Sequence, residues 1–244
     1  MQEPTPSARP HWLDLILYVL VGYGLPSVIG FIFLETTNAS VPPTWFTAIV
    51  TLTNLVSLGG AAIVLGVLRH KFSLAEIGFF PVKWQWRWWG WVAGIVVLTL
   101  PVRMFLGWIA QILVEGNMDS VAVRGQIVSP DGASWANFWI ALIGIGLLAP
   151  VSEELFFRGA LYLWFRGRYG VVIAVASSSL LFAAAHSDSA GAVAASLVIG
   201  VVNAIVFERT KSLWMAIAIH AFNNTLAVLL IYGAMALAPL AGAT

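Results

Sequence analysis

Two adjacent carboxylates and an arginine interrupt an apolar stretch near the middle of the chain, in the segment Pro150-Val-Ser-Glu153-Glu154-Leu-Phe-Phe-Arg158-Gly159. Ionisable side chains inside a membrane-spanning helix cost about 2.5–3.5 kcal/mol each on insertion scales, so they usually face a bundle interior or a wet cavity. Glu154 and Arg158 are four residues apart and share a helix face, where they can form an ion pair. Glu153 is rotated from that face by about 100°. It is therefore the carboxylate that we expect to be free for chemistry.

Two histidines lie in later apolar segments and share helix faces with a second motif residue. Phe182 and His186 are four residues apart, and so are His220 and Asn224. A carboxylate and an imidazole that meet at one water molecule form a general-base pair, typically worth about 10²–10⁴-fold in rate. A histidine N–H and an asparagine amide suit the oxyanion that follows, at roughly 2.7–4 kcal/mol per donor. These groups are sufficient for peptide hydrolysis without a covalent intermediate.

Other interpretations of the same residues stay open. The Glu-Arg pair could be a structural clamp between helices, and a single buried histidine is often only a hydrogen-bonded packing residue. A zinc site is a further alternative, with His186, His220 and either Glu153 or Glu154 as three ligands and water as the fourth. The chain has no His-Glu-x-x-His motif, so we expect no metal or other cofactor. A serine nucleophile is disfavoured because no Gly-x-Ser-x-Gly motif occurs.

The composition indicates which elements must position these residues. The chain has 244 residues, of which 60% are hydrophobic and 9% are charged, whereas soluble domains contain about 25% charged residues. The absence of cysteine excludes disulfides, a thiolate nucleophile and cysteine-ligated metal. A net charge of +1 without a basic stripe argues against nucleic-acid binding. The chain is therefore expected to be a polytopic membrane protein.

Apolar segments of spanning length recur along the sequence. The expected fold is an all-α membrane bundle of about seven transmembrane helices, forming one integral-membrane domain over residues 1–244. Proline or glycine interrupts several segments, which membrane helices tolerate when neighbouring groups satisfy the freed backbone. The expected segments are 12–34, 45–68, 88–114, 137–165, 169–186, 190–207 and 213–235.

The distribution of cationic residues predicts an orientation, because cytoplasmic loops carry an excess of Lys and Arg. With the N-terminus in the cytoplasm, nine cationic residues fall on the inner side and Arg124 falls on the outer side. The sequence therefore predicts a cytoplasmic N-terminus, an external C-terminus and a location in a bacterial plasma membrane. The nine inner residues are Arg9, Arg69, Lys71, Lys83, Arg87, Arg166, Arg168, Arg209 and Lys211.

The predicted depths of the site residues do not agree with one another. Counting from the cytoplasmic ends at about 1.5 Å per residue, His220 is shallow, Glu153 is near mid-depth and His186 is near the outer end. The three side chains can meet only if segments tilt, break near Pro150 or begin deeper in the membrane than this count assumes.

The motifs Glu153-Glu154-x-x-x-Arg158, Phe182-x-x-x-His186 and His220-x-x-x-Asn224 resemble, in order, those of the CPBP family. That family includes the type II CAAX prenyl endopeptidases and bacterial proteins of the bacteriocin self-immunity type. The resemblance covers residues 137–235, which would form the catalytic core. Residues 1–136 match only in their hydrophobic character and would be family-variable N-terminal helices.

The resemblance implies an intramembrane glutamate-dependent protease that acts on membrane-associated peptide or protein substrates in the lipid bilayer. Glu153 would be the catalytic carboxylate, with His186 assisting it in activating water. His220 and Asn224 would hold the oxyanion, and the neighbouring Glu-Arg pair would brace the helix. Eukaryotic members of the family remove the last three residues of prenylated proteins, and some members have been described as metalloproteases.

Two other classes of function remain. The chain could be a non-catalytic membrane scaffold, regulator or immunity protein that binds another membrane protein or an exported peptide. It could also be a proton-coupled transporter, since intramembrane carboxylates and histidines form proton relays. Transporters often contain duplicated halves, and the sequence shows no such repeat.

Overall fold

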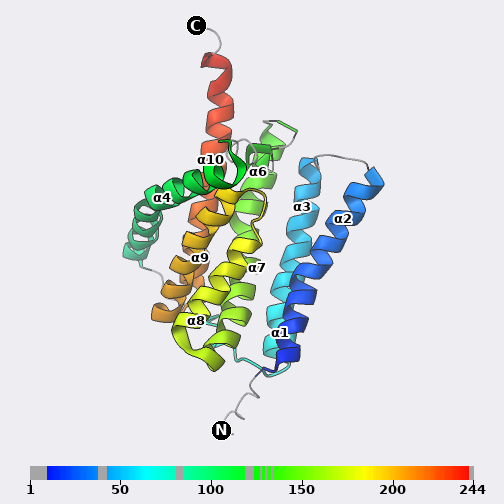
Figure 1. Ribbon diagram of the computed structural model, residues 1–244, viewed down its shortest axis with the longest axis vertical. Coiled ribbons are helices and arrows are strands. Elements are labelled where there is room, and N and C mark those ends of the chain that lie inside the picture. The colour runs from blue at the N-terminus through cyan, green and yellow to red at the C-terminus, as the bar shows by residue number, and fades with distance from the viewer. Residues whose placement is uncertain are drawn as a thin grey trace.

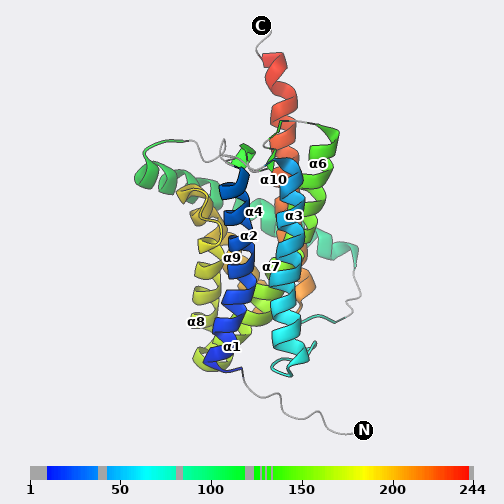
Figure 2. The same cartoon turned by 90° about the vertical axis from the view of Figure 1, so that its right-hand side faces the viewer.

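The computed structural model describes residues 10–37, 43–80, 85–118, 124–126, 128–129, 131–132 and 134–241. Every regular element in these ranges is a helix. Six helical runs within them are long and apolar enough to cross a membrane, and most of them lie roughly along one axis of the molecule (Figures 1 and 2). The protein is therefore an all-α, polytopic integral membrane protein, as its composition predicts.

The first two membrane passes lie side by side and each contains π-helical turns (Figures 1 and 2). The widened turns fall next to the positions where the sequence contains Pro26 and the Gly59-Gly60 pair. Such turns are rare and occur frequently at functional sites. The first pass comprises α1 (Trp12–Val19), η1 (Leu20–Gly24) and α2 (Leu25–Thr37), and the second comprises α3 (Thr44–Asn54), η2 (Leu55–Gly59) and η3 (Ala61–Leu68).

The third pass, α4 (Trp86–Glu115), is bent (Figure 1) and has Pro101 inside it. Proline removes one backbone hydrogen bond from a helix interior and its ring clashes with the preceding turn. Several large apolar side chains on α4 are exposed, including Trp86 and Leu98. In a membrane protein this apolar surface faces lipid.

One helical run of 50 residues, Trp135–Ala184, makes two passes through the bundle because the chain reverses at Gly170 (Figure 1). Gly170 has φ 80° and ψ −177°, a conformation that is open essentially only to glycine. The two passes correspond to the expected segments 137–165 and 169–186. The run consists of α6 (Trp135–Ala141), η4 (Leu142–Leu148), α7 (Ala149–Phe156), η5 (Phe157–Tyr162) and α8 (Leu163–Ala184).

The last two passes are α9 (Ala190–Thr210) and α10 (Leu213–Ala241), joined by a two-residue turn. The hydroxyl of Ser189 accepts a hydrogen bond from the N–H of Ala192 and so caps α9. Helix α9 packs against α4 and α8. A Cβ added at Gly200 would lie 3.2 Å from the Cβ of Ser179 and 3.3 Å from a ring carbon of Phe182. The small residue therefore permits the close approach of α8 and α9.

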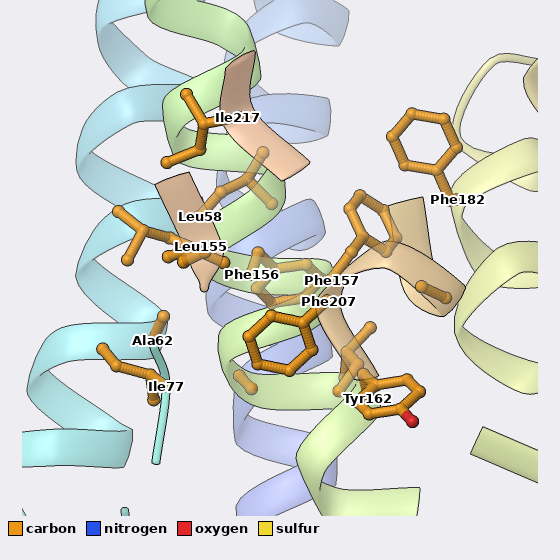
Figure 3. Close-up of a cluster of buried hydrophobic side chains, with 14 of the residues drawn as sticks. Leu58, Ala62, Ile77, Leu155, Phe156, Phe157, Tyr162, Phe182, Phe207 and Ile217 are labelled. Carbon is orange, nitrogen blue, oxygen red and sulfur yellow. The ribbon is translucent and has the colours of Figure 1, made fainter. Parts of the chain in front are cut away.

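The buried core contains aromatic side chains from α7, η5, α8 and α9, packed among aliphatic residues of the other passes (Figure 3). The rings of Phe156 and Phe157 meet edge to face at 5.3 Å, and the rings of Phe157 and Phe182 do so at 5.0 Å. Edge-to-face pairs add roughly 0.5–1.5 kcal/mol beyond the area they bury. This packing fixes α7 and η5, the elements that carry the paired carboxylates and the arginine.

Ion pairs gather at the end of the bundle where the described N-terminus lies (Figure 1). Asp14 accepts from Arg69 at 3.0 Å and lies 3.4 Å from Lys71. Glu208 pairs with Arg166 at 3.1 Å and with Lys211 at 2.9 Å. Cationic residues expected on the cytoplasmic side thus share one end of the molecule. The direction of that end in the membrane stays a prediction.

The close contact at Gly200 predicts an effect on stability. In Gly200→Val the new methyl groups would overlap Ser179 and Phe182, and overpacking costs about 1–3 kcal/mol. We expect a clear fall in the unfolding temperature of the purified protein in detergent. Gly233→Val is the matched control, because a Cβ at Gly233 meets no atom within 4 Å. Equal effects of the two substitutions would contradict this account of the α8–α9 contact.

Candidate active site

Glu154 is fully buried and its Oε1 atom accepts three hydrogen bonds. The donors are Arg158 Nη1 at 3.1 Å, Asn203 Nδ2 at 2.9 Å and His220 Nδ1 at 2.8 Å. They come from η5, α9 and α10, while Glu154 itself lies on α7. Because a buried carboxylate is stable only when it is paired and hydrogen-bonded, this group links four elements of the bundle.

Arg158 extends the same network. Its side chain is fully buried, and Nη2 donates to the backbone carbonyl of Gly200 at 2.6 Å. The guanidinium carbon also lies 4.9 Å from the centre of the Phe182 ring, a distance at which cation–π attraction operates. Phe182 in turn has its ring centre 4.6 Å from that of His186 and 5.4 Å from that of His220. The Phe182 ring thus packs against the guanidinium of Arg158 and against both imidazoles.

The partners of the two histidines determine their tautomers. Nδ1 of His186 lies 2.8 Å from the carbonyl oxygen of Phe182, and Nδ1 of His220 lies 2.8 Å from Glu154 Oε1. A carbonyl oxygen and an ionised carboxylate can only accept, so each Nδ1 carries a proton and donates it. In the neutral imidazoles, each Nε2 is then an acceptor.

Glu153 faces both of these Nε2 atoms. Its Oε2 lies 3.8 Å from Nε2 of His186 and 3.8 Å from Nε2 of His220. The same oxygen is buried and has no hydrogen-bond partner among the described residues. Glu153 Oε2 therefore lies near two ring nitrogens that can accept, and it has no donor of its own among the described residues. A water molecule about 2.8 Å from Oε2 and from one Nε2 would satisfy these two atoms by donating both its protons.

A cavity of about 160 Å³ opens beside Glu153 and His186. Its wall combines Glu153 of α7, Phe157 of η5 and His186 with residues of the first two passes, Tyr23 and Asn54 among them. A volume of this size holds several water molecules, whose share of liquid volume is about 30 Å³ each. The unpaired carboxylate is thus next to a space that solvent and part of a peptide can occupy.

The structure resolves the conflict of depths found in the sequence. The turn between α9 and α10 lies nearer the middle of the bundle than the bend at Gly170 (Figures 1 and 2). Helix α10 therefore begins part-way along the bundle, and Nε2 of His220 comes within 3.8 Å of Glu153. A deeper start was one of the three ways in which the side chains were expected to be able to meet.

Asn224 is placed differently from the other motif residues. Its Nδ2 donates to the carbonyl of Ile145 at 3.1 Å, and its Oδ1 accepts from Asn223 at 3.1 Å. Asn223 also accepts a hydrogen bond from Arg103 of α4. Asn224 does not border the cavity beside Glu153. Its expected part in holding an oxyanion stays a prediction.

The donor atoms can also be compared with the requirements of zinc. Among the described residues, no group of three or more His, Asp and Glu side chains is arranged to hold a metal ion. The separation of 3.8 Å between Glu153 Oε2 and each Nε2 exceeds the roughly 3.3 Å between atoms that share tetrahedral zinc at about 2.0 Å. Glu154 Oε1 already has three partners. Zinc stays an alternative that chelation tests.

Sequence reasoning did not place two residues of this region in the site. Asn203 is a buried amide in an apolar helix, and that feature alone could have marked it as a partner of Glu154. Tyr23 belongs to no motif and lies in the first pass, far along the chain from the paired carboxylates. Only the folded arrangement brings Tyr23 to the cavity.

The network around Glu154 predicts a large cost when its cation is removed. Arg158→Met keeps much of the side-chain volume but leaves the buried carboxylate with only Asn203 and His220 as donors. We expect the free energy of unfolding to fall by about 3–5 kcal/mol, as measured by chemical unfolding in detergent. The double variant Glu154→Gln/Arg158→Met leaves no buried charge and should recover a large part of this loss. A double variant as unstable as the sum of the single variants would contradict the pairing.

Comparison with known proteins supports the motifs found in the sequence. Residues 135–226 match the family model described as type II CAAX prenyl endopeptidase Rce1-like. A relative from Escherichia coli, described as an uncharacterized 24.3 kDa protein, is 32% identical over 94 residues, which are 37% of this chain and 43% of the relative. The match thus spans less than half of that relative's length. No solved structure matches the chain. The expected resemblance to the CPBP family of intramembrane proteases is confirmed for residues 135–226, the part of the chain that carries all three motifs.

Proposed function

We propose that this membrane protein is an endopeptidase in which Glu153 activates a water molecule for attack on a peptide bond. One observation carries the proposal: the buried Oε2 of Glu153, which has no hydrogen-bond partner among the described residues, lies 3.8 Å from Nε2 of His186 and of His220, beside a cavity. A carboxylate oxygen near ring nitrogens that can accept favours a donor such as water beside it. The family match at residues 135–226 favours a protease over the other classes of membrane protein.

In the proposed reaction, Glu153 is the general base and later the general acid. The bound water donates one hydrogen bond to Glu153 Oε2 and one to Nε2 of His186, which fixes the direction of its lone pair. Glu153 takes a proton while the water oxygen attacks the carbonyl carbon of the substrate. When the tetrahedral intermediate collapses, the C–N bond breaks and the carboxylic acid returns the proton to the leaving amine. The products are a new carboxylate and a free amine.

His220 prepares this site through Glu154. Its Nδ1–H donates to the buried carboxylate, which holds the ring with Nε2 directed towards Glu153. To hold the oxyanion, as the family resemblance implies, the ring would first take up a second proton from solvent, and Nε2–H would then be the donor. Asn224 would assist only through the amide hydrogen that it does not give to Ile145.

We propose that the substrate is a membrane-associated peptide or protein, with prenylated C-terminal sequences as the first candidates. The support is the family description together with the position of the cavity between helices of a membrane bundle. We further propose the orientation that the cationic residues predict, with the N-terminus in the cytoplasm of a bacterial cell. The ion-paired end of the bundle would then face the cytoplasm.

Replacing the proposed base tests the function. Glu153→Gln keeps the side-chain shape but cannot accept a proton from water, so we expect cleavage to fall by about 10²–10⁴-fold. The assay follows cleavage of prenylated and unprenylated membrane-anchored peptides by mass spectrometry, with unfolding temperature as the check on folding. Glu35→Gln, at an exposed position on α2, is the control and should retain wild-type cleavage. A Glu153→Gln protein that still performs its cellular role would instead favour a scaffold or regulator.

Chelation distinguishes activation of water by Glu153 alone from activation by a bound zinc ion. If Glu153 acts as the base without a metal, overnight dialysis against a strong zinc chelator should leave the rate of peptide cleavage within about twofold of the untreated enzyme. Loss of activity of 10-fold or more that added zinc restores would overturn this prediction, since a Lewis acid would then generate the nucleophile. Chelator that has been saturated with zinc beforehand is the control for effects on the detergent micelle.

A further inference from the structure

The phenol of Tyr23 is a hydrogen-bond donor in the cavity beside Glu153. Its oxygen is buried and has no hydrogen-bond partner among the residues that the structure describes, although buried hydroxyls nearly always have one. Tyr23 borders the same cavity as Glu153 and His186. Of the donor side chains around this cavity, Tyr23 is the one whose polar atom is both buried and unpaired within the described part of the chain.

The packing around Tyr23 holds its ring in place. The ring meets Phe156 edge to face at 5.5 Å and Phe157 at 6.0 Å. The preceding residue, Gly22, lies so close to α7 that an added Cβ would come within 2.6 Å of the Phe156 ring. Both residues belong to the π-helical turn η1. A side chain fixed in this way keeps its place in the cavity wall without further loss of rotamer entropy when a substrate binds.

The cavity has hydrogen-bond acceptors on one wall and a hydrogen-bond donor on the other. On one wall of the cavity, Glu153 Oε2 and Nε2 of His186 are acceptors and suit a water molecule, and Nε2 of His220 lies 3.8 Å behind Glu153 Oε2. The wall formed by the first pass contributes the O–H of Tyr23. Hydrolysis of an amide needs both, because the attacking water must lose a proton and the carbonyl oxygen must be stabilised as it becomes negative. The expected second donor, Asn224, instead gives a hydrogen bond to Ile145.

We propose that Tyr23 donates a hydrogen bond to the carbonyl oxygen of the scissile peptide bond as this oxygen becomes an oxyanion. The inference rests on the proposed function and assigns a catalytic residue to it. As the water oxygen bonds to the carbonyl carbon, the π electrons of the C=O bond move to oxygen, and the phenol O–H stabilises that charge without transferring its proton. On collapse the C=O bond re-forms, the C–N bond breaks, and the amine receives its proton from Glu153.

This role places part of the active site outside the segment that matches the family. Tyr23 lies on η1, whereas the match covers residues 135–226. The first pass would then be part of the catalytic unit and not only an anchor. A catalytic core without it would retain the base and the histidines but would lack this oxyanion donor.

Removing the hydroxyl tests the proposal directly. In Tyr23→Phe the aromatic packing is kept, so we expect an unchanged unfolding temperature and a fall in kcat of about 10²–10³-fold, the usual effect of deleting one oxyanion donor. KM for the best-cleaved peptide of the membrane-anchored set should stay within twofold. Tyr232→Phe is the matched control, because its hydroxyl is also buried and unpaired among the described residues but lies in a separate cluster. It should retain wild-type kinetics.

Two further measurements make the outcome decisive. A peptide in which CH₂–NH replaces the scissile amide lacks the oxygen that Tyr23 would hold, so it should bind the wild type and Tyr23→Phe equally. Weaker binding by the variant, a rise in KM alone or an unchanged kcat would each overturn the proposal. If Glu153→Gln abolishes cleavage while Tyr23→Phe does not change it, only the role of Tyr23 fails. If the wild type cleaves no peptide of the set, the proposed function and this inference fail together.

Discussion

The buried charge of Glu154 is the interaction on which the site depends. A carboxylate in a low-dielectric interior is tolerated only when opposite charge and hydrogen-bond donors surround it. Here the donors are Arg158, Asn203 and His220, each from a different helical element. The positions of those elements are therefore coupled, because a shift of any one would leave a polar group in the core without its partner.

The next residue along the same helix has the opposite environment. The Oε1 atom of Glu154 has three protein donors, although its Oε2 has none among the described residues; the Oε2 of Glu153 also has no donor among them, and Glu153 lines a cavity. The rotation of about 100° between consecutive helical residues is sufficient to produce this difference. Glu154 also orients His220, whose Nε2 lies 3.8 Å from Glu153, the proposed base. Support from a rigid second layer is what holds catalytic groups in a productive geometry.

Local spacing was informative for two of the three motif pairs at i, i+4 spacing. The i, i+4 relation predicted that Glu154 meets Arg158 and that Phe182 shares a face with His186, and both pairs are in contact. The apolar segments likewise predicted an all-α membrane bundle, since their length is set by the thickness of the bilayer. These features are encoded in short stretches of sequence and do not depend on how the helices are arranged.

Features that depend on the arrangement of helices could not be predicted in this way. The level of His220 depends on where the turn before α10 lies, and neither hydropathy nor periodicity reports that level. The partner of Asn224 is a backbone carbonyl on another pass, and backbone groups carry no sequence signal. Tyr23 is a single aromatic residue in an apolar helix, where most aromatic residues serve packing alone.

The reversal at Gly170 has a consequence for how Glu153 and His186, the proposed base and its partner imidazole, are aligned. Glu153 stands seventeen residues before this glycine and His186 sixteen residues after it, so the hairpin has arms of nearly equal length. At about 1.5 Å per residue both arms reach the same height. Along much of each arm, the number of residues between Gly170 and the site then matters more for this alignment than the identity of each side chain. An insertion in one arm would move base and imidazole apart by about one helical turn for every 3.6 residues added, while a matching insertion in the other arm would realign them.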